Sequence, residues 1–154
     1  MRDFSVLIGG KAGEGLNKAG QILAHLLGSL GYKIYMYYDY PSLIRGGHNF
    51  SIIRASDIKI ASHRENVDVI LALNQDTVDL HKNKVRQGGT IIYDSNYVKD
   101  VITNGIGIPL LTIIKEENAP PITRNSGIIG AFSKTVGIEW NVLERVIARD
   151  IPKG

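Results

Sequence analysis

A glycine-rich break between an apolar segment and an amphipathic segment constrains the fold of this chain most strongly. Residues 4–8 are apolar apart from Ser5, residues 9–15 contain four glycines, and the next fifteen residues carry leucine, isoleucine and alanine at steps of three and four. This order predicts a strand, a tight turn and a helix. Glycine lets another molecule approach the main chain closely, and N–H groups at a helix start favour an anion. We therefore expect a charged ligand group at this turn, or a turn shaped by packing alone.

The glycine spacing matches neither of the two common phosphate-binding patterns. A dinucleotide fingerprint has glycines at n, n+2 and n+5, and a P-loop ends in Gly-Lys-Ser/Thr. Here Gly10, Gly13 and Gly15 are spaced differently, and Leu16 stands where the lysine would be. Glu14 also places a negative charge inside the turn. The turn therefore predicts contact with a ligand or partner without specifying a nucleotide.

Composition excludes several classes of function. A chain of 154 residues with 44% hydrophobic and 21% charged residues is one globular domain, residues 1–154. The absence of cysteine excludes disulfides, cysteine-bound clusters and thiol catalysis within the chain and fits a reducing cytoplasm. The net charge of +3 is scattered, and no long apolar run is present. We expect neither a nucleic-acid partner nor a membrane span.

Hydrophobic periodicity predicts strands that alternate with helices. The first strand, the helix and the second strand are expected to form a right-handed βαβ unit with parallel strands, and Gly31 is expected to end the helix. The whole pattern predicts a three-layer, doubly wound α/β fold with a mostly parallel, Rossmann-like sheet. Strands are expected at 4–8, 33–38, 49–54, 58–61, 67–73, 90–93 and within 106–114, with 58–61 paired to 49–54, and helices at 15–30, 76–86, 126–136 and 142–148.

Polar loops follow four of these strands. In open α/β sheets, ligands bind beyond the carboxyl ends of the strands. The loops 9–15, 39–49, 74–76 and 94–96 should therefore meet at one rim. We define the rim as these four loops.

The segment Arg45-Gly46-Gly47-His48-Asn49 is the second distinctive feature. The Arg45 guanidinium is suited to a phosphate, a carboxylate or an interface, or it is a solvated surface group. His48 would act as an acid or base, or hold the start of a strand.

No catalytic or metal-binding set is evident elsewhere. No G-x-S-x-G elbow occurs, and the other three histidines lack metal-ligand spacing. The residues alone do not predict a self-sufficient catalyst.

Four ordered segments resemble one known family. They are Val6-Leu-Ile-Gly-Gly-Lys-Ala-Gly-Glu-Gly15, Arg45-Gly-Gly-His-Asn49, Ala72-Leu-Asn-Gln-Asp76 and Gly88-Gly-Thr-Ile-Ile-Tyr-Asp-Ser95. As a set they resemble the gamma subunit, or gamma domain, of the pyruvate and 2-oxoglutarate (2-oxoacid):ferredoxin oxidoreductases of anaerobic metabolism. The start of the chain and residues 40–45 are most similar to the form fused to the amino terminus of the alpha subunit.

The resemblance implies a non-catalytic part of an enzyme complex. Such complexes oxidise a 2-oxoacid to acyl-coenzyme A and pass electrons to ferredoxin. Thiamine diphosphate, Mg and 4Fe-4S clusters would belong to alpha, beta and ferredoxin-like delta partners, so this chain would hold no cofactor and be inactive alone. It would pack on the catalytic core and help to enclose coenzyme A. The implied coenzyme or subunit contacts are Gly10, Lys11, Gly13, Glu14, Gly15, Arg45, Gly46, Gly47, His48, Asn49 and Asn74.

Other interpretations remain open from the sequence. The chain ends earlier than gamma domains usually do, so we expect a domain shortened at its C-terminus. In isolation, a sheet edge or the open rim would support a homodimer. The alternatives are an independent nucleotide-binding α/β protein that uses the 9–15 turn, and an interaction module without a ligand.

Overall fold

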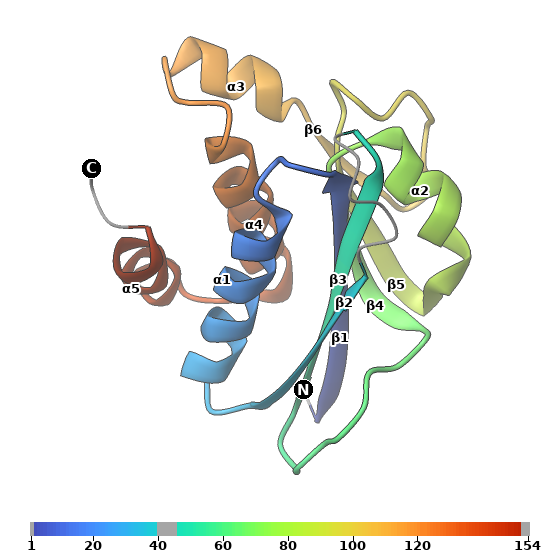
Figure 1. The fold of residues 1–154 in the computed structure, drawn as a ribbon, viewed down its shortest axis with the longest axis vertical. Helices are drawn as coiled ribbons and strands as arrows, with labels where there is room; N and C mark the ends of the chain where they lie inside the picture. The colour runs from blue at the N-terminus through green and yellow to red at the C-terminus, as the bar shows by residue number, and fades with distance from the viewer. Residues whose placement is uncertain (1, 40–45, 152–154) are drawn as a thin grey trace.

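A six-stranded sheet forms the centre of the molecule, with helices on both faces (Figure 1). The computed structural model describes residues 2–39 and 46–151. The elements are β1 (Asp3–Lys11), α1 (Leu16–Ser29), β2 (Lys33–Asp39), β3 (His48–Ser56), β4 (Val67–Ala72), α2 (Gln75–His81), the 3-10 turn η1 (Lys82–Lys84), β5 (Val85–Asp94), β6 (Ile106–Ile108), α3 (Leu110–Glu116), α4 (Thr123–Val136) and α5 (Trp140–Asp150).

The sheet has the strand order β2-β3-β1-β4-β5-β6. β1, β4, β5 and β6 are parallel neighbours, whereas β3 runs antiparallel to both β1 and β2. β2 therefore runs in the same direction as β1. The chain leaves β1 toward one edge of the sheet and later continues from β4 toward the other edge. This reversal places a topological switch point between β1 and β4, where α/β sheets form their binding crevice.

Two apolar cores hold the three layers together. Helices α1, α4 and α5 lie on one face of the sheet and α2 lies on the other (Figure 1). The core under α1 and α4 includes Leu23, Leu71 and Phe132, and the core under α2 includes Ile70 and Val78. β4 is buried along its whole length, as a central parallel strand covered on both faces should be. The predicted α/β, three-layer, mostly parallel architecture is confirmed.

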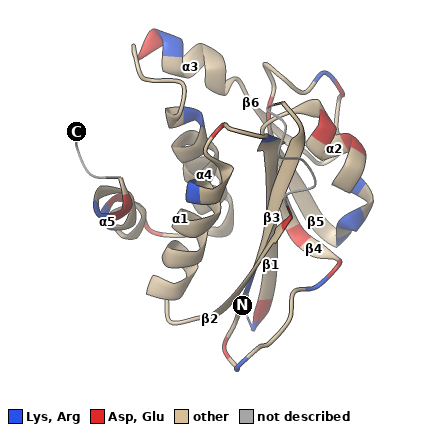
Figure 2. Cartoon of the chain, in the orientation of Figure 1, with Lys and Arg blue, Asp and Glu red and all other residues tan. Residues whose placement is uncertain are grey.

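Charged residues are sparse on the strands and occur mainly on α2, α5 and several connecting segments (Figure 2). Helix α1 ends as predicted, because Gly31 adopts a left-handed φ of 93° directly after the C-cap residue. Gly137 ends α4 in the same way, with φ 78°.

The predicted βαβ unit needs one correction. β1 and β2 are parallel in direction, but they are not neighbours, because β3 lies between them and pairs with both. The predicted glycine turn also begins later than expected. Gly9 and Gly10 belong to β1 and pair with Phe50 and Asn49 of β3, so the turn itself starts at Ala12.

Two other predicted elements differ from the structure. Residues 58–61 form no strand. The helix predicted over 76–86 ends at His81, and Gly88 and Gly89 lie inside β5 rather than at a helix end. The strand predicted within 106–114 is present as the short strand β6, and helix α3 begins at Leu110.

Candidate functional site

The described parts of the predicted rim lie together at the carboxyl end of β1. The turn after β1 is tied to the segment before β3, because the Ala12 N–H donates to the Gly47 carbonyl at 2.6 Å. The ladder between β1 and β3 brings Gly10 opposite Asn49 and Lys11 opposite His48. Five of the predicted contact residues, from two distant segments, are thus joined by main-chain pairing. Arg45 lies outside the described residues.

A buried arginine holds this turn in place. Arg124, in the first turn of α4, donates from Nε to Asp94 Oδ2 at 2.9 Å and from Nη2 to the Leu73 carbonyl at 2.7 Å. Its Nη1 lies 3.6 Å from Glu14 Oε2. Its guanidinium carbon lies 4.2 Å from the centroid of the Tyr97 ring, a cation–π distance. One side chain therefore joins the ends of β4 and β5 to the glycine turn.

Asn125 completes the attachment of the turn to α4. Its side-chain nitrogen donates to the Glu14 carbonyl at 2.7 Å. Glu14 is thus held by its main chain and lies close to a cation through its side chain. The negative charge of Glu14 is therefore partly balanced by Arg124 within the site.

Two hollows flank the turn. One, of about 240 Å³, lies between the turn and the start of α4 and is lined by Gly13, Glu14, Pro121, Ile122, Arg124 and Asn125. The other, of about 520 Å³, is open and is lined by Lys11, Ala12, Gly13, Glu14 and Gly46. Lys11 is exposed and forms no ion pair within the described ranges 2–39 and 46–151. It is the cation at the turn that is available to a ligand or partner.

The glycines of this segment have different structural roles. A Cβ atom on Gly9 would lie 2.7 Å from Thr77 Cγ2 of α2, and one on Gly10 would lie 3.2 Å from Leu73 Cβ. These two glycines allow close packing of β1 against its neighbours. Gly15 has φ 76°, and a Cβ atom there would lie 2.5 Å from Ile122 Cδ1. Gly13 has φ 89° and open space around it, so this glycine is the one that presents bare backbone to an incoming group.

Asn74, another predicted contact residue, has an internal role. It caps α2, since its Oδ1 accepts from the Thr77 N–H at 3.1 Å and from the Thr77 hydroxyl at 2.6 Å. The Leu73 N–H donates to the Gly9 carbonyl at 3.0 Å, so the loop after β4 stays beside β1. Asn74 is therefore positioned at the rim, with its amide oxygen already occupied.

His48 forms a pair with a histidine of α2. The Nε2 atoms of His48 and His81 are 2.8 Å apart, and the Phe50 ring is stacked on His48 and tilted against His81. Burial lowers the pKa of His48. Burial, with the neighbouring His48 and Lys84, lowers the pKa of His81 to about 4. Both rings are therefore neutral near pH 7, with one Nε2 donating and the other accepting.

Three buried polar atoms near the rim have no hydrogen-bond partner among the described residues. They are Nδ1 of His48, Nδ1 of His81 and Oδ1 of Asn49. Buried polar atoms are nearly always hydrogen-bonded in native proteins. Their grouping around the start of β3 leaves unused hydrogen-bonding capacity at this end of the sheet.

Sequence reasoning missed the residues that organise the site. Arg124, Asn125 and the pairing role of His81 were not predicted. A signal for the first two is present, because two polar residues follow Pro120 and Pro121 at the start of a helix. Their partners lie 30 or more positions away, a separation that helical periodicity does not reveal.

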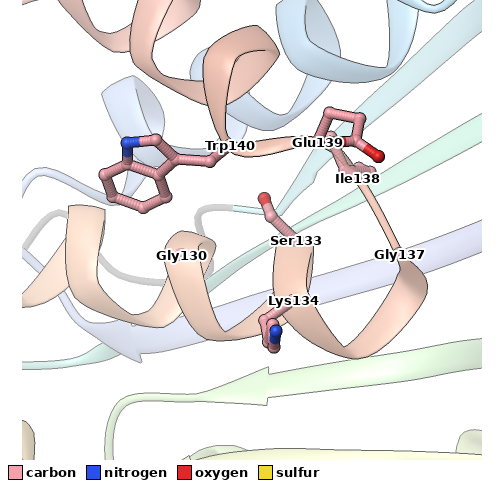
Figure 3. Close-up of a pocket in the computed structure, with 7 residues that line it drawn as sticks. All are labelled: Gly130, Ser133, Lys134, Gly137, Ile138, Glu139 and Trp140. Carbon is pink, nitrogen blue, oxygen red and sulfur yellow. The ribbon is translucent and has the colours of Figure 1, made fainter.

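A separate hollow of about 460 Å³ lies at the turn between α4 and α5 (Figure 3). Its lining includes Ser133, Lys134 and Glu139, and the Trp140 ring, 69% exposed, stands beside it. It is at the far end of α4 from Arg124, about 15–20 Å away along the helix. Its few polar groups do not converge, so it is not the candidate site.

Two features are absent from the described residues. Within the described ranges, no group of three or more His, Asp or Glu side chains is arranged to hold a metal ion. None of the helices described has the length and apolar character needed to cross a bilayer.

Family comparison agrees with the fold. The profile of the pyruvate ferredoxin/flavodoxin oxidoreductase family matches residues 5–154. The chain belongs to this family. The resemblance drawn from the four ordered segments is confirmed.

The similar curated proteins are of two lengths. The chain is 37% identical over 94 residues to the alpha subunit of 2-oxoacid:ferredoxin oxidoreductase 2 of Aeropyrum pernix, a match that covers 61% of the chain and 15% of that subunit. It is 28% identical over 153 residues to the 2-oxoglutarate synthase subunit KorC of Archaeoglobus fulgidus, a match that covers 99% of the chain and 81% of that subunit. The same domain therefore exists within long alpha subunits and as a short separate subunit.

Solved structures share the fold. The gamma subunit of a keto/oxoacid ferredoxin oxidoreductase from Geobacter sulfurreducens has a TM-score of 0.86 at 22% identity, with 99% of the chain and 87% of that subunit covered. The 2-oxoglutarate:ferredoxin oxidoreductase of Magnetococcus marinus, solved with 2-oxoglutarate, coenzyme A and succinyl-CoA bound, has a TM-score of 0.83 at 24% identity. The match covers 97% of the chain and 27% of that larger chain.

Proposed function

We propose that this chain is the gamma-type domain of a 2-oxoacid:ferredoxin oxidoreductase complex, in which it packs on a catalytic core and forms part of the enclosure of coenzyme A. The complex would convert a 2-oxoacid to acyl-coenzyme A and transfer electrons to ferredoxin. Thiamine diphosphate, Mg and iron–sulfur clusters would be held by alpha, beta and ferredoxin-like partners. Because the chain lacks cysteine, a reducing cytoplasm is the compartment we propose for it.

The observation that carries the proposal is an open, pre-arranged rim without a catalytic set. Gly13 exposes backbone beside a hollow of about 520 Å³, and Lys11 is an unpaired cation at its edge. Arg124 fixes the turn from behind. Such a surface can bind a phosphate-bearing ligand or a protein surface, and among the described rim residues we identify no nucleophile held beside a general base.

Seven of the eleven predicted contact residues fall into two groups under this proposal. Lys11, Gly13 and Gly46 face the open hollow and would touch the coenzyme or a partner subunit. Gly10, Gly15 and Asn74 would support the rim through packing and capping. Arg45 remains in the first group on the strength of its sequence motif alone.

The decisive experiment is affinity purification of the tagged chain from its native source, followed by cofactor analysis of the recovered proteins. Recovery of partner chains that contain thiamine diphosphate and iron would support the complex. Recovery of the chain alone with a bound nucleotide would instead favour the independent nucleotide-binding protein.

A binding test with substitutions addresses the coenzyme contact. In the recovered complex, Lys11→Ala and Arg45→Ala should weaken coenzyme A binding without lowering the thermal unfolding temperature of the domain. Lys18→Ala is a matched control, because Lys18 is an exposed lysine on α1. An equal loss of binding for Lys18→Ala would contradict a specific role for the turn.

A further inference from the structure

The edge strand β2 lacks the features that usually prevent edge-to-edge association. It pairs with β3 over all seven of its residues in continuous register, without a bulge, and it is the terminal strand of the sheet. Within the described ranges, its other edge has no strand partner. Natural edge strands are commonly short, bulged, proline-containing or charged along their length. β2 has none of these protections, whereas the opposite edge strand, β6, has three residues.

The charges of β2 lie only at its two ends. Lys33 begins the strand, Asp39 ends it, and the five residues between them are Ile-Tyr-Met-Tyr-Tyr. A second copy paired antiparallel about Met36 would place Lys33 opposite Asp39 of that copy, and Asp39 opposite its Lys33. The strand is thus complementary to itself in charge. A shift of two residues in either direction would separate both pairs of opposite charges.

We propose that β2 is the contact strand of a two-fold symmetric homodimer, in which the β2 strands of two copies pair antiparallel about Met36. The two sheets would join into one continuous sheet of twelve strands. A self-complementary patch used by both copies is what a two-fold dimer requires.

The side chains of β2 suit this register. Ile34 and Met36 face α1, since they approach the Cβ positions of Gly28 and Gly20 at 3.6 and 3.4 Å. Tyr35 and Tyr37 lie on the opposite face, because side chains alternate along a strand. In a pairing centred on Met36, each residue lies opposite the residue that is equally far from Met36 on the other side. Tyr35 would therefore lie opposite Tyr37 of the second copy. Cross-strand aromatic pairs are among the more stabilising pairs in antiparallel sheets.

The helices leave room for this pairing. Helix α1 packs over β2 and β3, and a two-fold axis perpendicular to the sheet places both α1 helices on the same face. The two β3 strands would be three strand spacings apart, about 14 Å. Packed helices need about 8–10 Å between axes, so the two α1 helices would not overlap.

Sedimentation velocity over a dilution series tests the proposal. The wild-type chain should reach twice the 16.9 kDa of one copy as its concentration rises. Lys33→Glu and Asp39→Lys should each weaken the dimer by about tenfold, because each places like charges opposite one another at two symmetric sites. The double variant with both changes should recover most of the wild-type affinity. Circular dichroism of each variant checks that the fold is retained.

A cysteine reporter gives an independent measurement. The chain has no cysteine, so Met36→Cys introduces a single thiol at the proposed two-fold axis. In an oxidising glutathione buffer it should form disulfide-linked dimers faster than Ile58→Cys, whose site is 67% exposed and lies outside the contact. A chain that stays monomeric throughout the series would overturn the proposal. So would single charge variants with unchanged affinity, or equal cross-linking at both positions.

Discussion

Arg124 shows how one buried side chain can hold several loops together at one end of a sheet. The side chain of Asp94 is fully buried, and its Oδ2 accepts from Arg124 at 2.9 Å. Its other oxygen accepts from the Asn96 N–H at 3.0 Å. An ion pair of this kind is costly to break, because removal of one partner leaves a buried charge without compensation.

Replacement of Arg124 by methionine should therefore destabilise the protein strongly. We expect Arg124→Met to lower the free energy of unfolding by about 3–5 kcal/mol, measured by urea denaturation. Addition of Asp94→Leu should restore part of the loss, because the unpaired charge is then removed. Arg145→Met, at an exposed position on α5, is the control and should change stability by no more than about 0.5 kcal/mol. A similar loss for both single variants would contradict the role of Arg124.

The pair of His48 and His81 predicts that the stability of the folded protein depends on pH. The pKa of His81 is lowered to about 4, so the folded state disfavours its protonated form. Above the ordinary histidine pKa of about 6.5, His81 is neutral in both the folded and the unfolded state, so its titration does not reduce the stability of the folded state. As pH falls from about 6.5 toward 4, the unfolded state takes up the proton first, and stability decreases by about 2 kcal/mol or more.

Thermal unfolding between pH 7.5 and 4 measures this decrease. His81→Leu should flatten that part of the pH profile, because the substituted side chain does not titrate. An identical pH profile for wild type and His81→Leu would assign the dependence to other groups.

At the scale of elements, the turn between β1 and α1 combines backbone strain with close packing. Gly13 and Gly15 both have positive φ, but a Cβ atom meets nothing within 4 Å at Gly13 and meets Ile122 at 2.5 Å at Gly15. Gly13→Ala should thus cost about 1 kcal/mol of stability from the left-handed backbone alone. Gly15→Ala should cost clearly more, because Ile122 must also move.

The two alanine variants are best compared by chemical denaturation under one set of conditions. If Gly13→Ala were the more destabilising of the two, packing against Ile122 would not be the cause. The unfolding slope should stay the same in both variants, since the extent of the folded structure is unchanged.

The outcome for individual elements shows which signals a sequence carries. The helix at 16–29 was predictable because its apolar face repeats over four turns and Gly31 ends it. β4 was predictable as a continuous apolar run. The position of β3 between β1 and β2 was not, because strand order depends on pairing between distant segments. For the same reason the rim loops were predictable as a group, whereas the Arg124 contacts with Asp94 and Leu73 were not.

At the scale of the whole molecule, the layers predict a gradient of local stability. β1 and β4 are central and buried on both faces, whereas β6 is short and lies at an edge. Hydrogen exchange of the native protein should be slowest in β1 and β4, with protection close to the global unfolding free energy, and much faster in β6. Faster exchange in β4 than in β6 would contradict this order.

Among the relatives, 61% of the chain matches part of a long alpha subunit, and 99% of it matches most of a short separate subunit. A domain that tolerates both settings needs a core that does not depend on the rest of the chain. The two apolar cores on either side of the sheet provide this independence.

The contacts of Arg124 have a consequence for how this site can change in evolution. A neutral residue at position 94 would leave a buried cation, and a neutral residue at position 124 would leave a buried anion. Neither substitution is acceptable by itself, so the two positions should vary together or not at all among homologues. Lys11 is exposed and forms no ion pair among the described residues, so no buried charge constrains its replacement. The rim thus combines a buried ion pair, whose two residues should change together, with an exposed lysine that can change by itself.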